Sequence, residues 1–324
     1  LNRSRIEENV SRRRKEVAQI YFSKFNINSE IYKVYDDDGL KDKILKEVFE
    51  KIDENTRHTE REKRRGEEEK EVTYKFCNLI KNSKNKVICG RLVKIYEGEI
   101  QSYDAKNDTV ITSNANNCAA SSTFYFDLKS EEIAFITRNA LGYNQFNKYF
   151  KALVEKYFED ITFEIFLENN IGELKEKLYA MSRILSVEAV IIPPNANRKD
   201  FARIFGPSEE EVRESGATKV ISKMEVSAKS KNALNIGTSY FDRILLAIKK
   251  GYASLVAKGR DENNENCTVT SEEDAPYKAT IWVIAPSNYI EKDDLEYFSI
   301  KAENELGKLL KSKQSEDDDD EEEN

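Results

Sequence analysis

Residues 239–250 read SYFDRILLAIKK, between the segments TKVISKMEVSA (residues 218–228) and YASLVAK (residues 252–258). Phe241, Ile244, Leu245 and Ile248 recur at the spacing of one face of an amphipathic helix. The flanking segments are short and apolar, which is typical of strands. The sequence therefore predicts a strand, a helix and a strand, and an α+β fold class in which helices and strands alternate over a mixed or antiparallel sheet.

The same region carries a local excess of positive charge. Nine Lys or Arg lie between residues 217 and 260 against two acids, Glu225 and Asp242, which is an excess of seven. Clustered cations neutralise phosphates and release counterions, which gives salt-dependent affinity for nucleic acid. Tyr240 and Tyr252 would then stack on exposed bases; the alternative is a solvated face with both tyrosines in the core. The candidate nucleic-acid-binding residues are Lys229, Lys231, Arg243, Lys249, Lys250, Lys258 and Arg260.

Charge is distributed unevenly over the rest of the chain. The 324 residues include 52 Lys and Arg and 60 Asp and Glu, for a formal net charge of −8. Residues 316–323 are eight consecutive acids, and without them the 60 acids fall to 52, which leaves a neutral body. Because like charges repel, we expect residues 311–324 to form a disordered acidic tail. This tail either keeps the protein soluble or competes with nucleic acid for the basic stretch.

The first part of the chain is predicted to be β-rich. A helix is expected at residues 40–52, because acids precede its apolar stripe. Residues 53–70 are expected to be a mobile loop or an exposed helical extension, and residues 104–122, which lack periodicity, a long loop. Gly90 suggests a bulge within its strand. The expected strands are residues 17–25, residues 71–80, residues 86–96 and a hairpin of residues 122–128 with 132–138.

Beyond residue 138 helices and strands alternate. Ser208 and Glu211 have capping-box spacing, and Gly216 is a plausible helix end. The strands at 252–258 and 278–285 are expected to pair antiparallel. The other expected elements are helices at residues 143–157, 174–185, 197–205, 209–215 and 294–310, and strands at residues 161–167 and 187–192. The predicted domains are a β-rich N-terminal domain with a basic arm (1–138), an α+β C-terminal domain (139–310) and the acidic tail (311–324).

The sequence gives little support for a catalytic site. His58 is the only histidine, and the four cysteines show no CxxC spacing, which argues against a zinc site. Neither a GxxxxGK[ST] nor a GxGxxG motif occurs. We therefore assign no catalytic residue, no metal ligand and no cofactor, and favour a non-enzymatic protein.

One enzyme alternative remains, a metal-dependent nuclease. Asp127 and Lys129 form an acid-x-Lys pair at a predicted strand end, with Asp104 and Asp108 upstream. Such a site needs carboxylates to hold Mg²⁺ and a lysine to stabilise developing charge. Exposed hairpin residues would give the same pattern.

Several phrases in the second half resemble a known group of sequences. They are Arg183-Ile184-Leu185, VIIPPN at residues 190–195, LLAIKKGYASLVAKGRD at residues 245–261, Asp274-Ala275-Pro276 and the strand at residues 279–283. Upstream, Gly90-Arg91-Leu92 and the hairpin at residues 124–135 fit the same layout. The chain resembles an uncharacterised bacterial and phage family of unknown function and, more loosely, the RexA-type phage-exclusion and Kiwa B-type anti-phage proteins. This resemblance implies a phage-defence or phage-exclusion setting with nucleic acid as the ligand, and it supplies no active-site motif.

These observations together predict a non-enzymatic nucleic-acid-binding protein of anti-phage defence or phage exclusion. Besides the nuclease, the alternative is an interaction subunit of a multi-component defence complex, whose basic stretch docks an acidic partner protein or its own tail. We expect a cytoplasmic protein without a membrane partner, because no apolar run approaches the ~18 residues that span a bilayer and the basic N-terminus lacks an apolar signal core. The β-rich part would serve partner binding or homo-oligomer formation.

Overall fold

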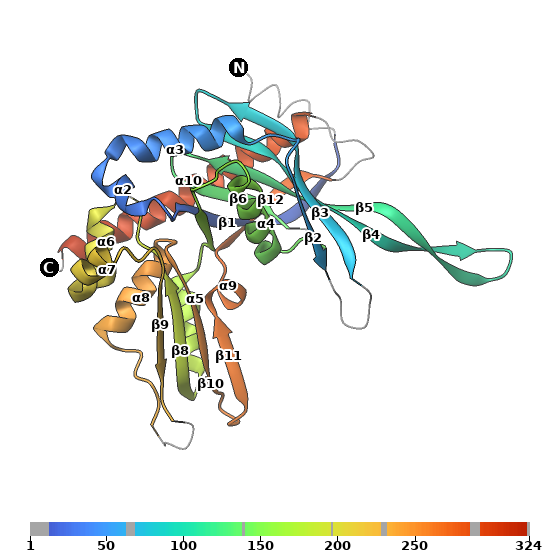
Figure 1. The fold of residues 1–324 in the computed structure, drawn as a ribbon. Helices are drawn as coiled ribbons and strands as arrows, with labels where there is room; N and C mark the ends of the chain where they lie inside the picture. The colour runs from blue at the N-terminus through green and yellow to red at the C-terminus, as the bar shows by residue number, and fades with distance from the viewer. Residues whose placement is uncertain are drawn as a thin grey trace.

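The computed structural model describes residues 13–62, 69–137, 140–195, 197–227, 232–285 and 292–322, without the side chains of Asp38 and of residues 314–322. It consists of two antiparallel sheets with helices packed against them (Figure 1). The α+β fold with a β-rich first half is therefore confirmed. None of the described helices has the length and apolar character required to cross a bilayer.

The first sheet has eight strands in the order β12-β1-β6-β5-β4-β3-β2, and β7 also pairs with β1. Strand β1, which pairs with β12, β6 and β7, alternates its side chains between two cores, as the strand pleat requires. Phe25 and Ile27 lie in one core with helices α3 and α4, whereas Ile20 and Phe22 lie in the other with α10. The bounds are β1 Lys15–Ile27, β2 Arg57–Glu62, β3 Lys70–Asn82, β4 Val87–Asp104, β5 Thr109–Asp127, β6 Glu132–Ile136, β7 Phe163–Leu167, β12 Lys278–Ile284, α2 Ile31–Asp36, α3 Asp38–Lys51, α4 Tyr143–Glu155 and α10 Lys292–Glu322.

The second sheet has four strands in the order β11-β10-β8-β9. Helices α5, α6 and α8 cover one face, where Phe241, Ile244 and Ile248 of α8 are buried as predicted. The opposite face carries charged side chains such as Lys223 and Lys258, both exposed. The bounds are β8 Arg183–Ile191, β9 Val220–Glu225, β10 Ala253–Arg260, β11 Asn266–Thr270, α5 Ile171–Ala180, α6 Arg198–Phe205, α7 Glu209–Ser215, α8 Ser239–Lys249, α9 Ser271–Asp274 and the 3-10 helix η1 Gly206–Ser208.

Most predicted elements are present, including α3, α8, β1 and the β5–β6 hairpin. Gly216 ends α7, as predicted, and takes the left-handed conformation. Gly90 marks a bulge, which lies on the partner strand β3 between Cys77 and Ile80. A side chain at residue 90 would approach Leu79 to 2.6 Å, so glycine makes room for the bulged leucine.

Several predictions are wrong. Residues 53–70 contain strand β2, and the expected loop at residues 104–122 is largely strand β5. The strands at 252–258 and 278–285 do not pair: β10 pairs with β11, whereas β12 pairs with β1 in the other sheet. The helix expected at 174–185 ends at Ala180, and Ser208 makes no side-chain capping bond.

The two sheets do not correspond to one N-terminal and one C-terminal part of the chain. Strands β7 and β12, both from beyond residue 138, join the first sheet. Residues 316–322 of the acidic run fall on the last turns of α10, where the side chains lie outside the described residues.

Candidate anion-binding groove

The basic residues predicted from the sequence lie on different parts of the second sheet. Arg243 and Lys249 belong to α8 on the covered face, and Lys250 is the residue that ends this helix. Arg243 stacks on Tyr240, with its Cζ 5.5 Å from the ring centre, and Lys250 Nζ lies 3.9 Å from Asp200 Oδ1.

The strand residues of the predicted set are elsewhere. Ala253, Leu255 and Ala257 of β10 face the core with α8, so Lys258 points to the opposite face. Arg260, at the end of β10, donates a hydrogen bond to the Asn264 carbonyl oxygen. Lys229 and Lys231 lie outside the described residues. The five described cations therefore do not form one surface, and binding through them stays a prediction.

The carboxylates of the predicted nuclease are not brought together. Asp127 organises the β5–β6 turn, where its Oδ1 accepts from Lys129 N at 3.0 Å and its Oδ2 from Ser130 Oγ at 3.0 Å. Asp104 and Asp108 lie at the far end of β5, where Asp104 accepts from Lys106 N and Asp108 from the Tyr103 hydroxyl. Within the described residues, no group of three His, Cys, Asp or Glu side chains is arranged to hold a metal ion. The described residues therefore do not form the expected Mg²⁺ cluster of Asp127 with Asp104 and Asp108, and nuclease activity stays an untested alternative.

A different set of cations does converge. A cavity of 790 Å³ and a neighbouring one of 430 Å³ share Lys41 and Lys129 in their walls. We call the two cavities together the basic groove. Among the described residues, six cations and two acids line it, an excess of four positive charges. The cations are Lys24, Lys41, Lys46, Lys86, Lys129 and Arg198, and the acids are Asp42 and Glu131.

Well-defined turns and helix ends hold these cations in place. Lys41 and Lys46 lie on α3, which begins where the Asp37 side chain accepts from Gly39 N. Lys86 takes a left-handed conformation, φ 59°, just before β4, and its Nζ lies 5.2 Å from the ring centre of Phe49.

The other walls come from later parts of the chain. Lys129 is in the β5–β6 turn that Asp127 organises. Arg198 begins α6 and donates a hydrogen bond to the Tyr35 carbonyl oxygen at 3.1 Å. Lys46, Lys129 and Arg198 are exposed to solvent, and Lys46 Nζ also lies 3.9 Å from Glu50 Oε1 at the surface.

The floor of the groove is partly neutralised by one carboxylate. Glu131 Oε2 lies 3.0 Å from Lys41 Nζ and 3.4 Å from Lys24 Nζ. Its Oε1 accepts a hydrogen bond from Asn195 Nδ2 at 2.9 Å. The carboxylate of Glu131 is thus fully engaged, and the two lysines that it bridges keep one net positive charge between them.

Behind this floor lies a buried ionic cluster. Lys313 of α10 reaches Glu132 Oε1 at 3.0 Å and Glu168 Oε1 at 2.7 Å. Burial, supported by repulsion from Glu132, raises the pKa of Glu168 to about 7, although Lys313 and Lys24 act against it. Burial lowers the pKa of Lys24, but attraction to the surrounding glutamates outweighs it, so that the pKa is raised. The cluster holds Lys24 through attraction to Glu132 and Glu168, and it connects Lys313 of α10 to β6 and to the end of β7.

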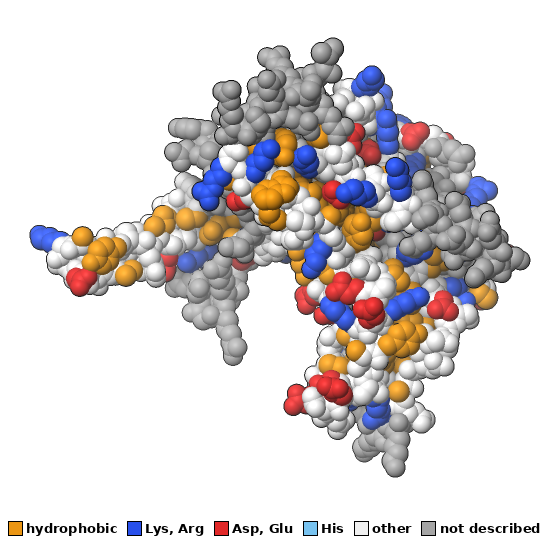
Figure 2. Space-filling view, turned by 180° about the vertical axis from the view of Figure 1, so that it is seen from behind, with side chains coloured by type: hydrophobic (Ala, Val, Ile, Leu, Met, Phe, Trp, Pro, Cys, Tyr) orange, Lys and Arg blue, Asp and Glu red, His pale blue; other side chains and the backbone are white. Residues whose placement is uncertain are grey.

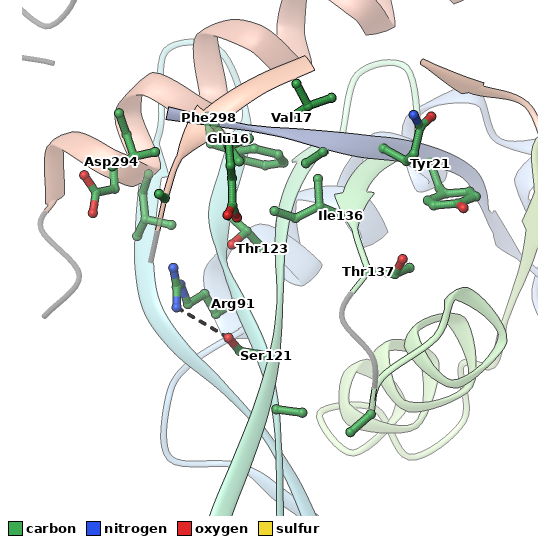
Figure 3. A pocket seen from close by; sticks show the side chains of 18 of the residues that line it. Glu16, Val17, Tyr21, Arg91, Ser121, Thr123, Ile136, Thr137, Asp294 and Phe298 are labelled. Atoms are coloured by element: carbon green, nitrogen blue, oxygen red, sulfur yellow. Dashed lines mark hydrogen bonds between the residues drawn. The ribbon is translucent and has the colours of Figure 1, made fainter. Parts of the chain in front are cut away.

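Another large cavity, of 740 Å³, lies where β1, β5 and α10 meet (Figure 3). Arg91 points into it and donates to Ser121 Oγ at 3.4 Å (Figure 3). The acids Glu16 and Asp294 also line this cavity, so the described residues of its walls have no excess of positive charge.

Comparison with protein families gives one match. The model described as Domain of unknown function (DUF4747) covers residues 18–291. The chain belongs to this family. No curated protein matches the chain. The DUF4747 match includes all six cations of the basic groove, whereas Lys313 lies beyond its end.

Sequence reasoning missed the basic groove of this DUF4747 protein. Its cations come from five separate segments and are interleaved along the chain with acids such as Asp42 and Glu47. A count of charge along the sequence therefore registers no excess there. A weak local signal existed in the lysine-rich turn KNSKNK at residues 81–86, which contributes Lys86.

Proposed function

We propose that this DUF4747 protein binds nucleic acid through phosphate contacts in the basic groove. The observation that carries the proposal is the convergence of six cations against two acids in two adjoining cavities. Cations that neutralise phosphates release condensed counterions, and this supplies most of the affinity in sequence-independent binding.

An extended polyanion suits the groove better than a single small anion. The cations lie on β1, α3, the turn before β4, the β5–β6 turn and α6, so a chain of phosphates can contact several segments at once. Tyr35 and Tyr252, the aromatic residues in the groove wall, are buried. They offer no exposed platform on which bases stack. We therefore expect contacts to the backbone of the nucleic acid and little sequence preference.

The test is a fluorescence anisotropy titration of labelled duplex and single-stranded oligonucleotides. Reversal of two exposed groove cations, in Lys46→Glu/Lys129→Glu, is expected to weaken binding about tenfold or more at 0.1 M salt, since two phosphate contacts are lost. The matched control, Lys223→Glu/Lys258→Glu, makes the same charge change on the exposed face of the second sheet and should bind like wild type. An effect of the control alone would place binding at the stretch predicted from the sequence and would refute the groove.

The resemblance to phage-exclusion proteins suggests a biological setting for this binding. If nucleic-acid binding contributes to phage exclusion, the double groove variant should restore plaque formation on a host that carries the protein. Equal plaque numbers on hosts with the wild type and with the variant would show that the groove does not contribute to phage exclusion.

A further inference from the structure

Strands β4 and β5 extend beyond the first sheet as a two-stranded ribbon (Figure 1). Pairing runs from Gly98↔Ala115 to Asp104↔Thr109 without a third strand among the described residues. An isolated two-stranded ribbon is only marginally stable in water. The ribbon therefore has reason to pair with something further.

Charge is divided sharply between the two strands of the ribbon. Residues 109–126 of β5 contain no charged side chain, although 35% of the residues in the chain are charged. Every charge of the ribbon lies on β4 or in the turn at its tip: Glu97, Glu99, Asp104, Lys106 and Asp108. Among the described residues the outer edges of both ribbon strands are open, and the edge of β5 is the uncharged one.

The edge of β5 opposite β4 is long and unguarded. Among the described residues, β6 pairs with β5 only at residues 124–127, so residues 109–123 have β4 as their strand partner. Native proteins usually protect such edges with charges, proline or bulges, because open backbone groups accept further strands. Here a bulge occurs near Asn117, φ 63°, and it leaves the tip segment TVITSNA (residues 109–115) as a regular edge.

Apolar side chains on the ribbon are exposed on both of its faces. Tyr103 and Val110 form a cross-strand pair and are 65% and 59% exposed. Ile111, 46% exposed, points to the other face, as does Ile100, 53% exposed. Figure 2 shows apolar side chains along the ribbon, which projects at the left of that view. A helix packed on one face would leave the other uncovered, whereas a strand added at the edge gives new neighbours to both faces.

We propose that residues 109–115 pair antiparallel, edge to edge, with the same residues of a second copy of this chain. The resulting four-stranded ribbon would have the order β4-β5-β5-β4 about a two-fold axis. A neutral strand can face its own copy without like-charge contact. The acids of both β4 strands would lie on the outer edges, about 4.8 Å further from the axis on each side. The division of charge in the ribbon is thus what pairing between two copies requires.

Sedimentation velocity of the full chain over a concentration series tests the proposal. The wild type should dimerise, and Thr112→Lys, which places lysines close to the axis in both copies, should raise the dimer dissociation constant about fivefold or more. The matched control is Gln101→Lys, because Gln101 is the cross-strand partner of Thr112 on the outer strand. It should dimerise like the wild type.

A monomeric wild type at all concentrations would overturn the proposal, as would equal effects of the two variants. Amide hydrogen exchange gives a second readout that needs no variant. Amides within residues 109–115 should become more protected as protein concentration rises, while protection of the edge strand β9 stays constant. Protection of residues 109–115 that does not change with concentration would refute pairing at this edge.

Discussion

Gly251 packs against Lys24 and Glu168 of the buried ionic cluster, and Gly251→Ala tests that packing. Its φ is +77°, a region that costs a residue with a side chain about 1–2 kcal/mol. An added Cβ would stand 2.5 Å from Lys24 Cβ and 2.7 Å from Glu168 Oε1. Lys24 Cβ belongs to a central strand and cannot retreat, so overpacking adds about 1–3 kcal/mol. The expected loss of unfolding free energy is about 2–5 kcal/mol.

The assay is urea denaturation of the full chain, and Gly216→Ala is the matched control. Gly216 has φ +66°, and a Cβ there would meet no atom within 4 Å. This control keeps the backbone cost and removes the clash, so it should lose only about 1–2 kcal/mol. If Gly251→Ala is no less stable than Gly216→Ala, the close packing of Gly251 against Lys24 and Glu168 is wrong.

Two further predictions concern the cluster and the acidic run. The pKa of Glu168 is about 7 in the folded protein, against an ordinary value of 4.5. The stability that protonated Glu168 contributes is therefore fully present below pH 4.5 and is lost as the pH rises through 7. Between pH 4.5 and 8 the wild type should lose about 3 kcal/mol more unfolding free energy than Glu168→Gln, and parallel stability profiles from urea denaturation would contradict this. Deletion of residues 316–323 should raise nucleic-acid affinity at low salt. The acidic run begins three residues after Lys313, and Lys313 lies close enough to Lys24 of the groove floor for the two charges to interact. Unchanged affinity in an anisotropy titration would count against competition between these acids and nucleic acid.

Elements with one buried face could be predicted from the sequence. The stripe of Phe241, Ile244 and Ile248 located α8, because one side of that helix packs against the second sheet. Strand β5 was missed for the complementary reason. Its outer half is exposed on both faces, so no alternation of apolar and polar residues marks it. Nor does local sequence indicate which sheet a strand joins, and β12 was therefore paired with β10 when its partner is β1, more than 250 residues earlier.

The candidate site could not be predicted from local sequence patterns for a related reason. The density of Lys and Arg along residues 217–260 is real, but α8 and β10 direct those side chains to different faces. Lys24, Lys86 and Arg198 line adjoining cavities only because segments far apart in the sequence lie side by side in the fold. A site of this kind depends on contacts between distant segments.

The dependence of nucleic-acid affinity on salt tests the central proposal most directly. The logarithm of the association constant should fall linearly with the logarithm of salt concentration, with a slope that reports the number of phosphates contacted. In Lys46→Glu/Lys129→Glu the magnitude of this slope should be smaller by about two, because two contacts are lost, and in Lys223→Glu/Lys258→Glu it should equal that of the wild type. Equal slopes for the groove variant and the wild type would contradict phosphate binding in the basic groove.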